Sequence, residues 1–355
     1  MLFWIRKKTI ALFFLLPRLP TPPTLQEIKM AQKIANGFGE LGPLEEYHYS
    51  FVQDGKLTLV GRKFVAQPTH NWGHRVAFAG TSVLTFDKGS QSWERHDFSE
   101  LISEENVDET LFVRDDKLHL LVYTNFGAIE FKKLFRWENN TFVELKLTAP
   151  ARKSLDEQHR TEFIAANGVT SKGETVLLVG EDGIQLYTLS VDGSSAHIAE
   201  PVSISREDKF LNGKPVLAEA LGNQVLVSYG VHGCGFRWES SRFFVFNLDT
   251  KSVRAIEVKM DFSELPKYCF TGPKTSTVNP ATNSWIVAAG SIQQGMTGSA
   301  HYGAVWALKN VFDESAEPTW VELPHTVDEG EHILDGLDLY TVTKDAVSKI
   351  QLDNV

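Results

Sequence analysis

Residues 53–61 read QDGKLTLVG, in which a tight turn leads directly into an apolar strand. A turn and strand of this kind recur five more times along the chain. The further copies are RDDKLHLLVY (114–123), SKGETVLLVG (171–180), LGNQVLVSYG (221–230), PATNSWIVAAG (280–290) and LDGLDLYTV (334–342). The strands of successive copies begin 50 to 61 residues apart, so the chain is built from six internal repeats.

The first five repeats each hold three more short apolar runs, one before the turn and two after the quoted strand. In the first repeat these runs are YHYSFV (47–52), SVLTFD (82–87) and WERHDF (93–98). Four short strands in a repeat of this length are typical of a β-propeller blade, and no long amphipathic helix pattern follows residue 45. We therefore predict an all-β fold, a single six-bladed β-propeller whose blades are four-stranded antiparallel sheets.

The last repeat lacks one strand, because only LDLYTVT (337–343) and AVSKIQL (346–352) follow its turn. The segment before the first repeat, residues 31–44, is predicted to supply the missing strand. The N- and C-terminal strands would then share one blade and close the ring. The propeller is assigned to residues 30–355.

Residues 1–29 are assigned to a targeting segment or a disordered extension outside the fold. Arg6-Lys7-Lys8 precede a short apolar run, residues 9–16, as in a signal peptide, but bulky residues come before the charges and no small-residue cleavage pair follows. The run is too short to cross a bilayer, which takes about 20 apolar residues. A cytoplasmic protein is therefore predicted, with a secreted protein as the alternative if residues 1–29 are a signal peptide.

The sequence FDKGSQSW (86–93) has an aromatic residue, an aspartate and, after five more residues, a tryptophan. This pattern resembles the third strand and following turn of the kelch family of propellers, and FNLDTKS (246–252) looks like a degenerate copy. The resemblance implies a propeller fold, and kelch-like propellers often serve as adaptors that bind other proteins.

Composition narrows the classes of partner. The chain carries a net charge of −10, with no basic stripe, which argues against binding to nucleic acid. No phosphate-binding loop, dinucleotide fingerprint or nucleophile elbow is present, so no cofactor is predicted. Cys234 and Cys269 are interpreted as buried free thiols, and they would pair only in an exported protein. A monomer that binds a protein or a small molecule is predicted.

The connections from the second to the third strand of a blade are long at residues 67–75, 231–241 and 291–303. Connections of this kind open on one face of a propeller, and long loops in a compact domain are often functional. They carry histidines together with Trp, Tyr and Arg, the side chains enriched at binding hot spots. The predicted binding residues are His70, Trp72, His74, Arg75, His232, Arg237, Trp238, His301 and Tyr302. No metal site is predicted, because the spacing of His70 and His74 brings two ligands together on a helix and not in a loop.

No catalytic constellation stands out, so the sequence favours a non-catalytic, kelch-like scaffold that binds a protein or ligand through this loop face. Two alternatives stay open. One is a small-molecule enzyme, hydrolytic or metal-dependent, with a histidine-containing site on the same face. The other is a secreted, lectin-like propeller.

Overall fold

The computed structural model describes most of the chain after residue 30. The described residues are 31–39, 46–68, 74–98, 108–124, 128–151, 153–154, 163–181, 183–204, 214–230, 242–256, 268–270, 275–288, 291–294, 298–301, 304–326 and 330–352. They form β-strands and turns, and no α-helix occurs among them, which confirms the predicted all-β class. Nor do these residues include any helix long and apolar enough to cross a membrane.

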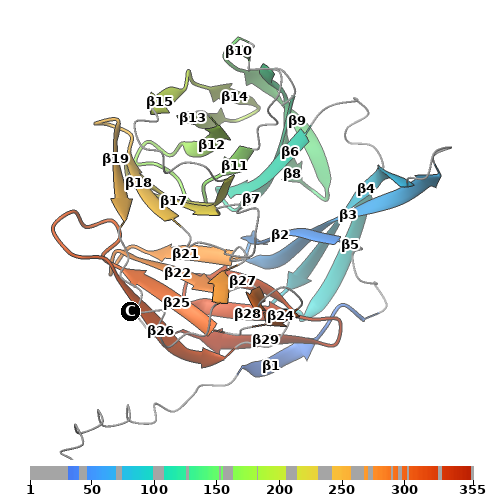
Figure 1. The fold of residues 1–355 in the computed structure, drawn as a ribbon. Coiled ribbons are helices and arrows are strands. Elements are labelled where there is room, and N and C mark those ends of the chain that lie inside the picture. Colours follow the sequence, from blue (N-terminus) through green and yellow to red (C-terminus); the bar gives the residue numbers. More distant parts are fainter. Residues whose placement is uncertain are drawn as a thin grey trace, which may run out of the picture.

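Four separate four-stranded antiparallel sheets are arranged around a common centre as propeller blades (Figure 1). One contains β2 (Glu46–Gln53), β3 (Lys56–Pro68), β4 (His74–Asp87) and β5 (Ser92–Phe98). The next contains β16 (Lys214–Leu221), β17 (Gln224–Gly230), β18 (Arg242–Asn247) and β19 (Ser252–Ile256). A third contains β21 (Thr275–Asn279), β22 (Ser284–Ala288), β25 (Ala304–Lys309) and β26 (Thr319–Thr326). The last contains β27 (Glu331–Asp335), β28 (Asp338–Val342), β29 (Ala346–Gln351) and β1 (Gln32–Asn36).

The second and third repeats form one ten-stranded sheet instead of two separate blades. The second repeat supplies β6 (Asp108–Arg114), β7 (Lys117–Thr124), β8 (Ala128–Glu138), β9 (Thr141–Thr148) and the short β10 (Lys153–Ser154). The third supplies β11 (Phe163–Ala165), β12 (Thr175–Glu181), β13 (Gly183–Asp192), β14 (Ser195–Ile198) and β15 (Val202–Ile204). The two halves join because the outer strands β9 and β14 pair in parallel, and the result is a near-closed barrel.

The prediction of six separate blades is therefore corrected to four blades and this barrel. The described residues also form a separate three-stranded sheet. It contains β20 (Tyr268–Phe270), β23 (Ser291–Gln294) and β24 (Gly298–His301). Strands β23 and β24 lie within residues 291–303, which we expected to be a loop between two strands of the fifth repeat.

The predicted closure through the two chain ends is confirmed. Strand β1 pairs antiparallel with β29, with Gln32 opposite Lys349 and Asn36 opposite Ala346. The indole of Trp93 in the first blade donates a hydrogen bond to the carbonyl of Asn36 at 3.3 Å. The N-terminal strand thus ties the last blade to the first.

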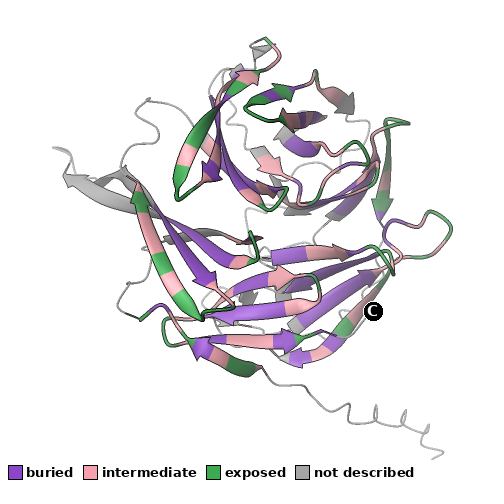
Figure 2. Ribbon diagram, turned by 180° about the vertical axis from the view of Figure 1, so that it is seen from behind, coloured by how far each residue is buried: buried purple, intermediate pink, exposed green. Residues whose placement is uncertain are grey.

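One strand of each repeat lies at the centre of the molecule. These inner strands neighbour one another in the order β2, β6, β11, β16, β21 and β27, and β27 returns to β2. Apolar side chains fill the spaces between neighbouring sheets, which explains why the second strands of the repeats are almost continuously apolar. Strand β22, for example, is buried along its whole length, whereas the outer strand β5 is mostly exposed or half-buried (Figure 2). Polar side chains on the inner strands are therefore the unusual feature of this architecture.

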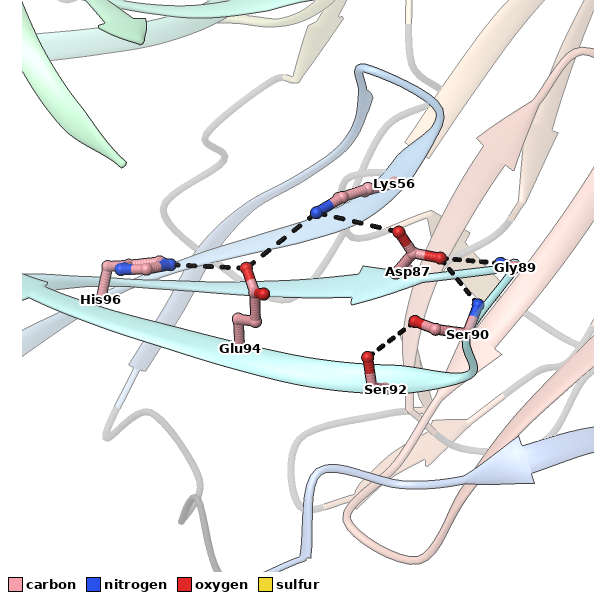
Figure 3. A network of polar contacts seen from close by, with 7 residues as sticks. All are labelled: Lys56, Asp87, Gly89, Ser90, Ser92, Glu94 and His96. Carbon is pink, nitrogen blue, oxygen red and sulfur yellow. Dashed lines mark hydrogen bonds and ion pairs between the residues drawn. The ribbon is translucent and has the colours of Figure 1, made fainter. Parts of the chain in front are cut away.

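The residues behind the kelch resemblance form the turn between β4 and β5 (Figure 3). The Oδ1 atom of Asp87 accepts hydrogen bonds from the backbone N–H groups of Gly89 and Ser90, both at 2.9 Å. These bonds, with that from Ser90 the largest influence, lower the pKa of Asp87. Asn247 plays the same part in the fourth repeat, where it accepts from Asp249 and Thr250 at 3.1 Å. The pattern therefore reflects turn chemistry; a propeller-like arrangement is shown, but kelch specifically is not.

Replacing Asp87 with alanine removes both turn acceptors and is expected to lower the melting temperature by a few degrees. Replacing it with asparagine should retain most of the stability, because Asn247 accepts the same two bonds in the fourth repeat. Differential scanning calorimetry of the two variants beside the parent protein measures the difference. Equal losses in both variants would show that the charge matters more than the acceptor geometry.

Candidate functional site

The nine binding residues predicted from the sequence fall mainly outside the described part of the chain. His70, Trp72, His232, Arg237, Trp238 and Tyr302 lie outside the described residues. His74 and Arg75 are in β4, paired with Pro68 and Gln67 of β3, and His301 ends β24 opposite Ser291. The residues at the ends of two expected loops thus belong to paired strands of β-hairpins. The side chains of these three residues are not described, so their convergence on one face stays a prediction.

A different residue, Glu219, is the most unusual ionisable group among the described residues. It lies on the inner strand β16, between Ala218 and Ala220, and only 3% of its surface is exposed. A carboxyl group so far from water is rare in a folded protein unless it is hydrogen-bonded or performs a function.

Two neighbouring repeats supply hydrogen bonds to this carboxyl group. Asn167, which follows β11, donates from Nδ2 to Oε1 at 3.0 Å. Ser276 of β21 donates from Oγ to the same oxygen. One oxygen of the carboxyl group is therefore held in place by donors from two neighbouring repeats.

Burial controls the protonation of Glu219. Removal of the carboxylate from water raises its pKa from 4.5 to about 7, and the side chains of Asn167, Ser276 and Trp285 oppose that rise. The group therefore exchanges a proton close to neutral pH. A carboxyl group with this property at the centre of a propeller can act as an acid or as a base.

The backbone around Asn167 fixes the position of its side chain. The Asn167 N–H donates to the carbonyl of Ala218 at 2.9 Å, and its carbonyl accepts from the N–H of Ala220 at 2.8 Å. Asn167 and Glu219 thus lie side by side in a parallel bridge. The next residue, Gly168, has φ +76°, and a Cβ atom there would lie 2.8 Å from the carbonyl oxygen of Ala220. Only glycine fits this close approach.

Gly168→Ala is expected to destabilise the protein by about 2 kcal/mol, because alanine meets both the unfavourable φ and the carbonyl of Ala220. Gly336→Ala is the matched control, since Gly336 also has a positive φ, +59°, but has open space around it. Calorimetric melting should show the larger loss for Gly168→Ala. Equal losses would mean that the segment moves away from β16 without cost.

A second buried ionisable group, His119, has a structural role. His119 of β7 stacks on Phe112, with ring centroids 5.2 Å apart, and its Nδ1 lies 2.9 Å from the carbonyl of Lys117. Burial lowers the pKa of His119 to about 4, so the ring is neutral at physiological pH. Within the described ranges, no three His, Cys, Asp or Glu residues are grouped as they would be to hold a metal ion.

Comparison with known proteins gives structural matches only. No protein-family model and no curated protein matches the chain. A mutant of the α-L-arabinofuranosidase arb93a from Fusarium graminearum, in complex with an iminosugar inhibitor, matches with 9% identity over 90% of this chain and 98% of that chain, at a TM-score of 0.49. The GH43 β-1,3-galactosidase BT3683 with galactodeoxynojirimycin matches with 9% identity over 83% and 99%, at 0.43. The WD40 domain of SCAP from fission yeast matches with 8% identity over 92% and 98%, at 0.38.

These matches correct the main functional prediction. A non-catalytic kelch-like scaffold was expected, whereas the matched structures include several glycoside hydrolases. These structures stand against the scaffold interpretation, which is not pursued further, and they fit the hydrolytic alternative better. At such low identity the matches assign no substrate to this chain, so its chemistry has to be argued from its own residues.

Proposed function

We propose that the protein is a hydrolytic enzyme that acts on a small molecule at the centre of the ring, with Glu219 as its proton-transfer group. The observation that carries the proposal is a carboxyl group, 3% exposed on an inner strand, whose Oε1 accepts hydrogen bonds from Asn167 and Ser276 of two neighbouring repeats. This arrangement differs from the predicted histidine-containing site, because the group that transfers the proton is a carboxyl.

The chemistry requires a group that can both give and take a proton. Hydrolysis needs a proton for the leaving group and a base for the attacking water. A carboxyl group with a pKa of about 7 meets either need at neutral pH, while an ordinary glutamate would be ionised and could only act as a base. Its position at the ring centre, where three repeats meet, also keeps bulk water away.

We further propose that the molecule is a ring of six structural units. The order of the six inner strands around the centre supports this count, as does the four-strand path within each half of the ten-stranded sheet. In this interpretation the barrel is two units whose outer strands have joined.

A panel of chromogenic 4-nitrophenyl substrates tests the proposal. It should contain esters, phosphates and glycosides, including a galactoside and an arabinofuranoside because two of the matched propellers are named for those sugars. We expect hydrolysis of at least one class, with a pH profile that bends close to pH 7. Absence of hydrolysis across the panel, together with no change in the pH titration of Glu219 when hydrolysis products are added, would contradict it.

A further inference from the structure

Trp285 of β22 carries a buried hydrogen-bond donor that the fold leaves unused. Only 1% of the residue is exposed, and among the described residues its indole Nε1–H finds no acceptor. Leaving a buried donor without an acceptor is costly, so native proteins rarely keep one without a reason. The groups around this indole therefore indicate what it is placed to bind.

Glu219 and Trp285 face each other across the space between the fourth and fifth repeats. Side chains alternate along a strand, so Leu217 and Leu221 lie on the same face of β16 as Glu219. Both leucines pack against the buried cluster that contains Trp285. Leu226, which pairs with Glu219 across β16 and β17, belongs to the same cluster. The carboxyl group therefore lies on the side of its sheet that meets the blade of Trp285.

Ser276 places the indole more closely. Its hydroxyl donates to Oε1 of Glu219, and it pairs with Val287 in the sheet of the fifth repeat. Trp285 pairs with Val278 of the same two strands, so Ser276 and Trp285 are diagonal neighbours on one face of that sheet. Diagonal neighbours are about 7–8 Å apart, within reach of an aromatic side chain. The indole also lowers the pKa of Glu219, as a donor beside a carboxylate does.

Aromatic packing holds the indole in this place. Trp285 meets Phe243 of β18 with ring centroids 5.6 Å apart and planes at 67°. It meets Trp320 of β26 with centroids 6.1 Å apart and planes at 53°. A ring that is packed in this way moves little, whereas the side chain of Glu219 has several rotatable bonds. The carboxyl group is therefore the partner that closes the remaining gap.

Charge makes this contact depend on the protonation of Glu219. A hydrogen bond to an ionised acceptor is about twice as strong as one between neutral groups. Among the described residues, the strands of the two facing sheets place two further charged side chains on this side, Arg254 of β19 and Glu322 of β26. Neither is among the causes that shift the pKa of Glu219. The acceptor best suited to the indole is thus the ionised carboxylate of Glu219.

We propose that Trp285 is a positioning residue for Glu219, and that its indole N–H donates a hydrogen bond to the carboxylate that forms when Glu219 gives up its proton. The catalytic role rests on the proposed hydrolysis, whereas the hydrogen bond does not. When Glu219 protonates a leaving group, the proton passes to that group and the negative charge stays on the carboxylate. A donor that engages only then stabilises the transition state more than the ground state.

The indole N–H resonances of the intact protein test the hydrogen bond without any substrate. In ¹⁵N–¹H correlation spectra between about pH 5 and about pH 9, the peak missing from Trp285→Phe identifies Trp285. This peak should move downfield as the pH rises, with a midpoint of about pH 7. In Glu219→Gln it should stay in place. The peak of Trp93, whose indole donates to the carbonyl of Asn36, is the control and should behave alike in the parent and in Glu219→Gln.

Turnover tests the catalytic role. Trp285→Phe keeps an aromatic ring but removes the donor, so kcat should fall about tenfold and the bend in the pH profile should rise by about one pH unit. Trp320→Phe removes a neighbouring indole whose Nε1–H also lacks an acceptor among the described residues. This matched variant should leave the pH profile unchanged, because β26 carries no hydrogen-bond partner of Glu219 among those residues.

Three results would overturn the proposal: a Trp285 peak that does not move, a peak that moves equally in Glu219→Gln, or an unchanged pH profile in Trp285→Phe. If Trp285→Phe does not fold, the parent and Glu219→Gln still decide, because the proposal requires one indole peak that loses its pH dependence in Glu219→Gln. A moving Trp285 peak without hydrolysis supports the hydrogen bond and contradicts only the proposed function. Hydrolysis that depends on Glu219, with a stationary Trp285 peak, contradicts only this inference.

Discussion

Replacing Glu219 with glutamine is expected to lower the hydrolytic turnover by about 100-fold or more, the usual range for loss of a general acid or base. Glutamine has nearly the same size, and its side-chain oxygen can still accept the hydrogen bonds that Asn167 and Ser276 donate to Oε1. The exchangeable proton of the carboxyl group is the feature that disappears. The loss should therefore fall on kcat, with a smaller change in KM.

Two controls separate this effect from a general loss of structure. Glu144→Gln changes an exposed carboxyl group on β9 and should leave turnover unchanged. Asn167→Ala keeps the carboxyl group but removes a hydrogen bond that favours its charged form, so the bend in the pH profile should move upward. Turnover of Glu219→Gln within about threefold of the parent enzyme would exclude Glu219 from catalysis.

The repeats could be predicted from the sequence because a strand that is buried on both faces of its sheet is almost continuously apolar. The apolar strands after each turn, such as LTLV at 57–60 and VLVS at 225–228, are the central strands that neighbouring sheets cover. The missing strand of the last repeat likewise predicted the pairing of β1 with β29. These features depend on local pattern and on counting strands, which the chain itself provides.

The joining of the second and third repeats left no comparable signal. Residues 146–148 of β9 pair in parallel with residues 195–197 of β14, yet both segments look like ordinary outer strands with alternating burial. The pairing depends on how two whole repeats tilt toward each other. Neither local propensity nor repeat spacing contains that information.

The site at Glu219 had a partial signal. Within VLAEA (216–220) the glutamate interrupts an apolar run on a strand expected at the centre, where charge is costly. Its partners could not be found in the same way, because Asn167 is 52 residues before it and Ser276 is 57 residues after it. They meet only once the ring has formed. The loops, with more histidines and aromatics, were the more conspicuous choice.

The stability of the protein should fall as pH rises from about 4.5 to about 7 because of Glu219. In the unfolded chain this group loses its proton near pH 4.5, whereas in the folded protein it keeps the proton up to about pH 7. The folded state therefore binds more protons in this window, and the free energy of unfolding falls by about 3 kcal/mol across it. For a chain of this length that loss corresponds to about 4 °C in melting temperature.

His119 acts in the opposite direction and has to be separated. The pKa of His119 is about 4 in the folded protein and 6.5 in the unfolded chain. Between these pH values the unfolded chain binds the proton and the folded protein does not, so the stability falls as the pH falls from 6.5 to about 4. The two effects offset each other over much of the window. The useful quantity is therefore the difference between the parent protein and Glu219→Gln, in which the contribution of His119 cancels.

Calorimetric melting of both proteins from pH 4.5 to pH 8 measures that difference. The parent protein should lose about 4 °C relative to Glu219→Gln as the pH rises, with the change centred below pH 7. In a His119→Phe variant the melting temperature should fall with rising pH because of Glu219, without the opposing increase that His119 causes in the parent protein. Parallel melting curves for the parent and Glu219→Gln at every pH would mean that Glu219 titrates normally, and the proton-transfer role proposed for it would lose its physical basis.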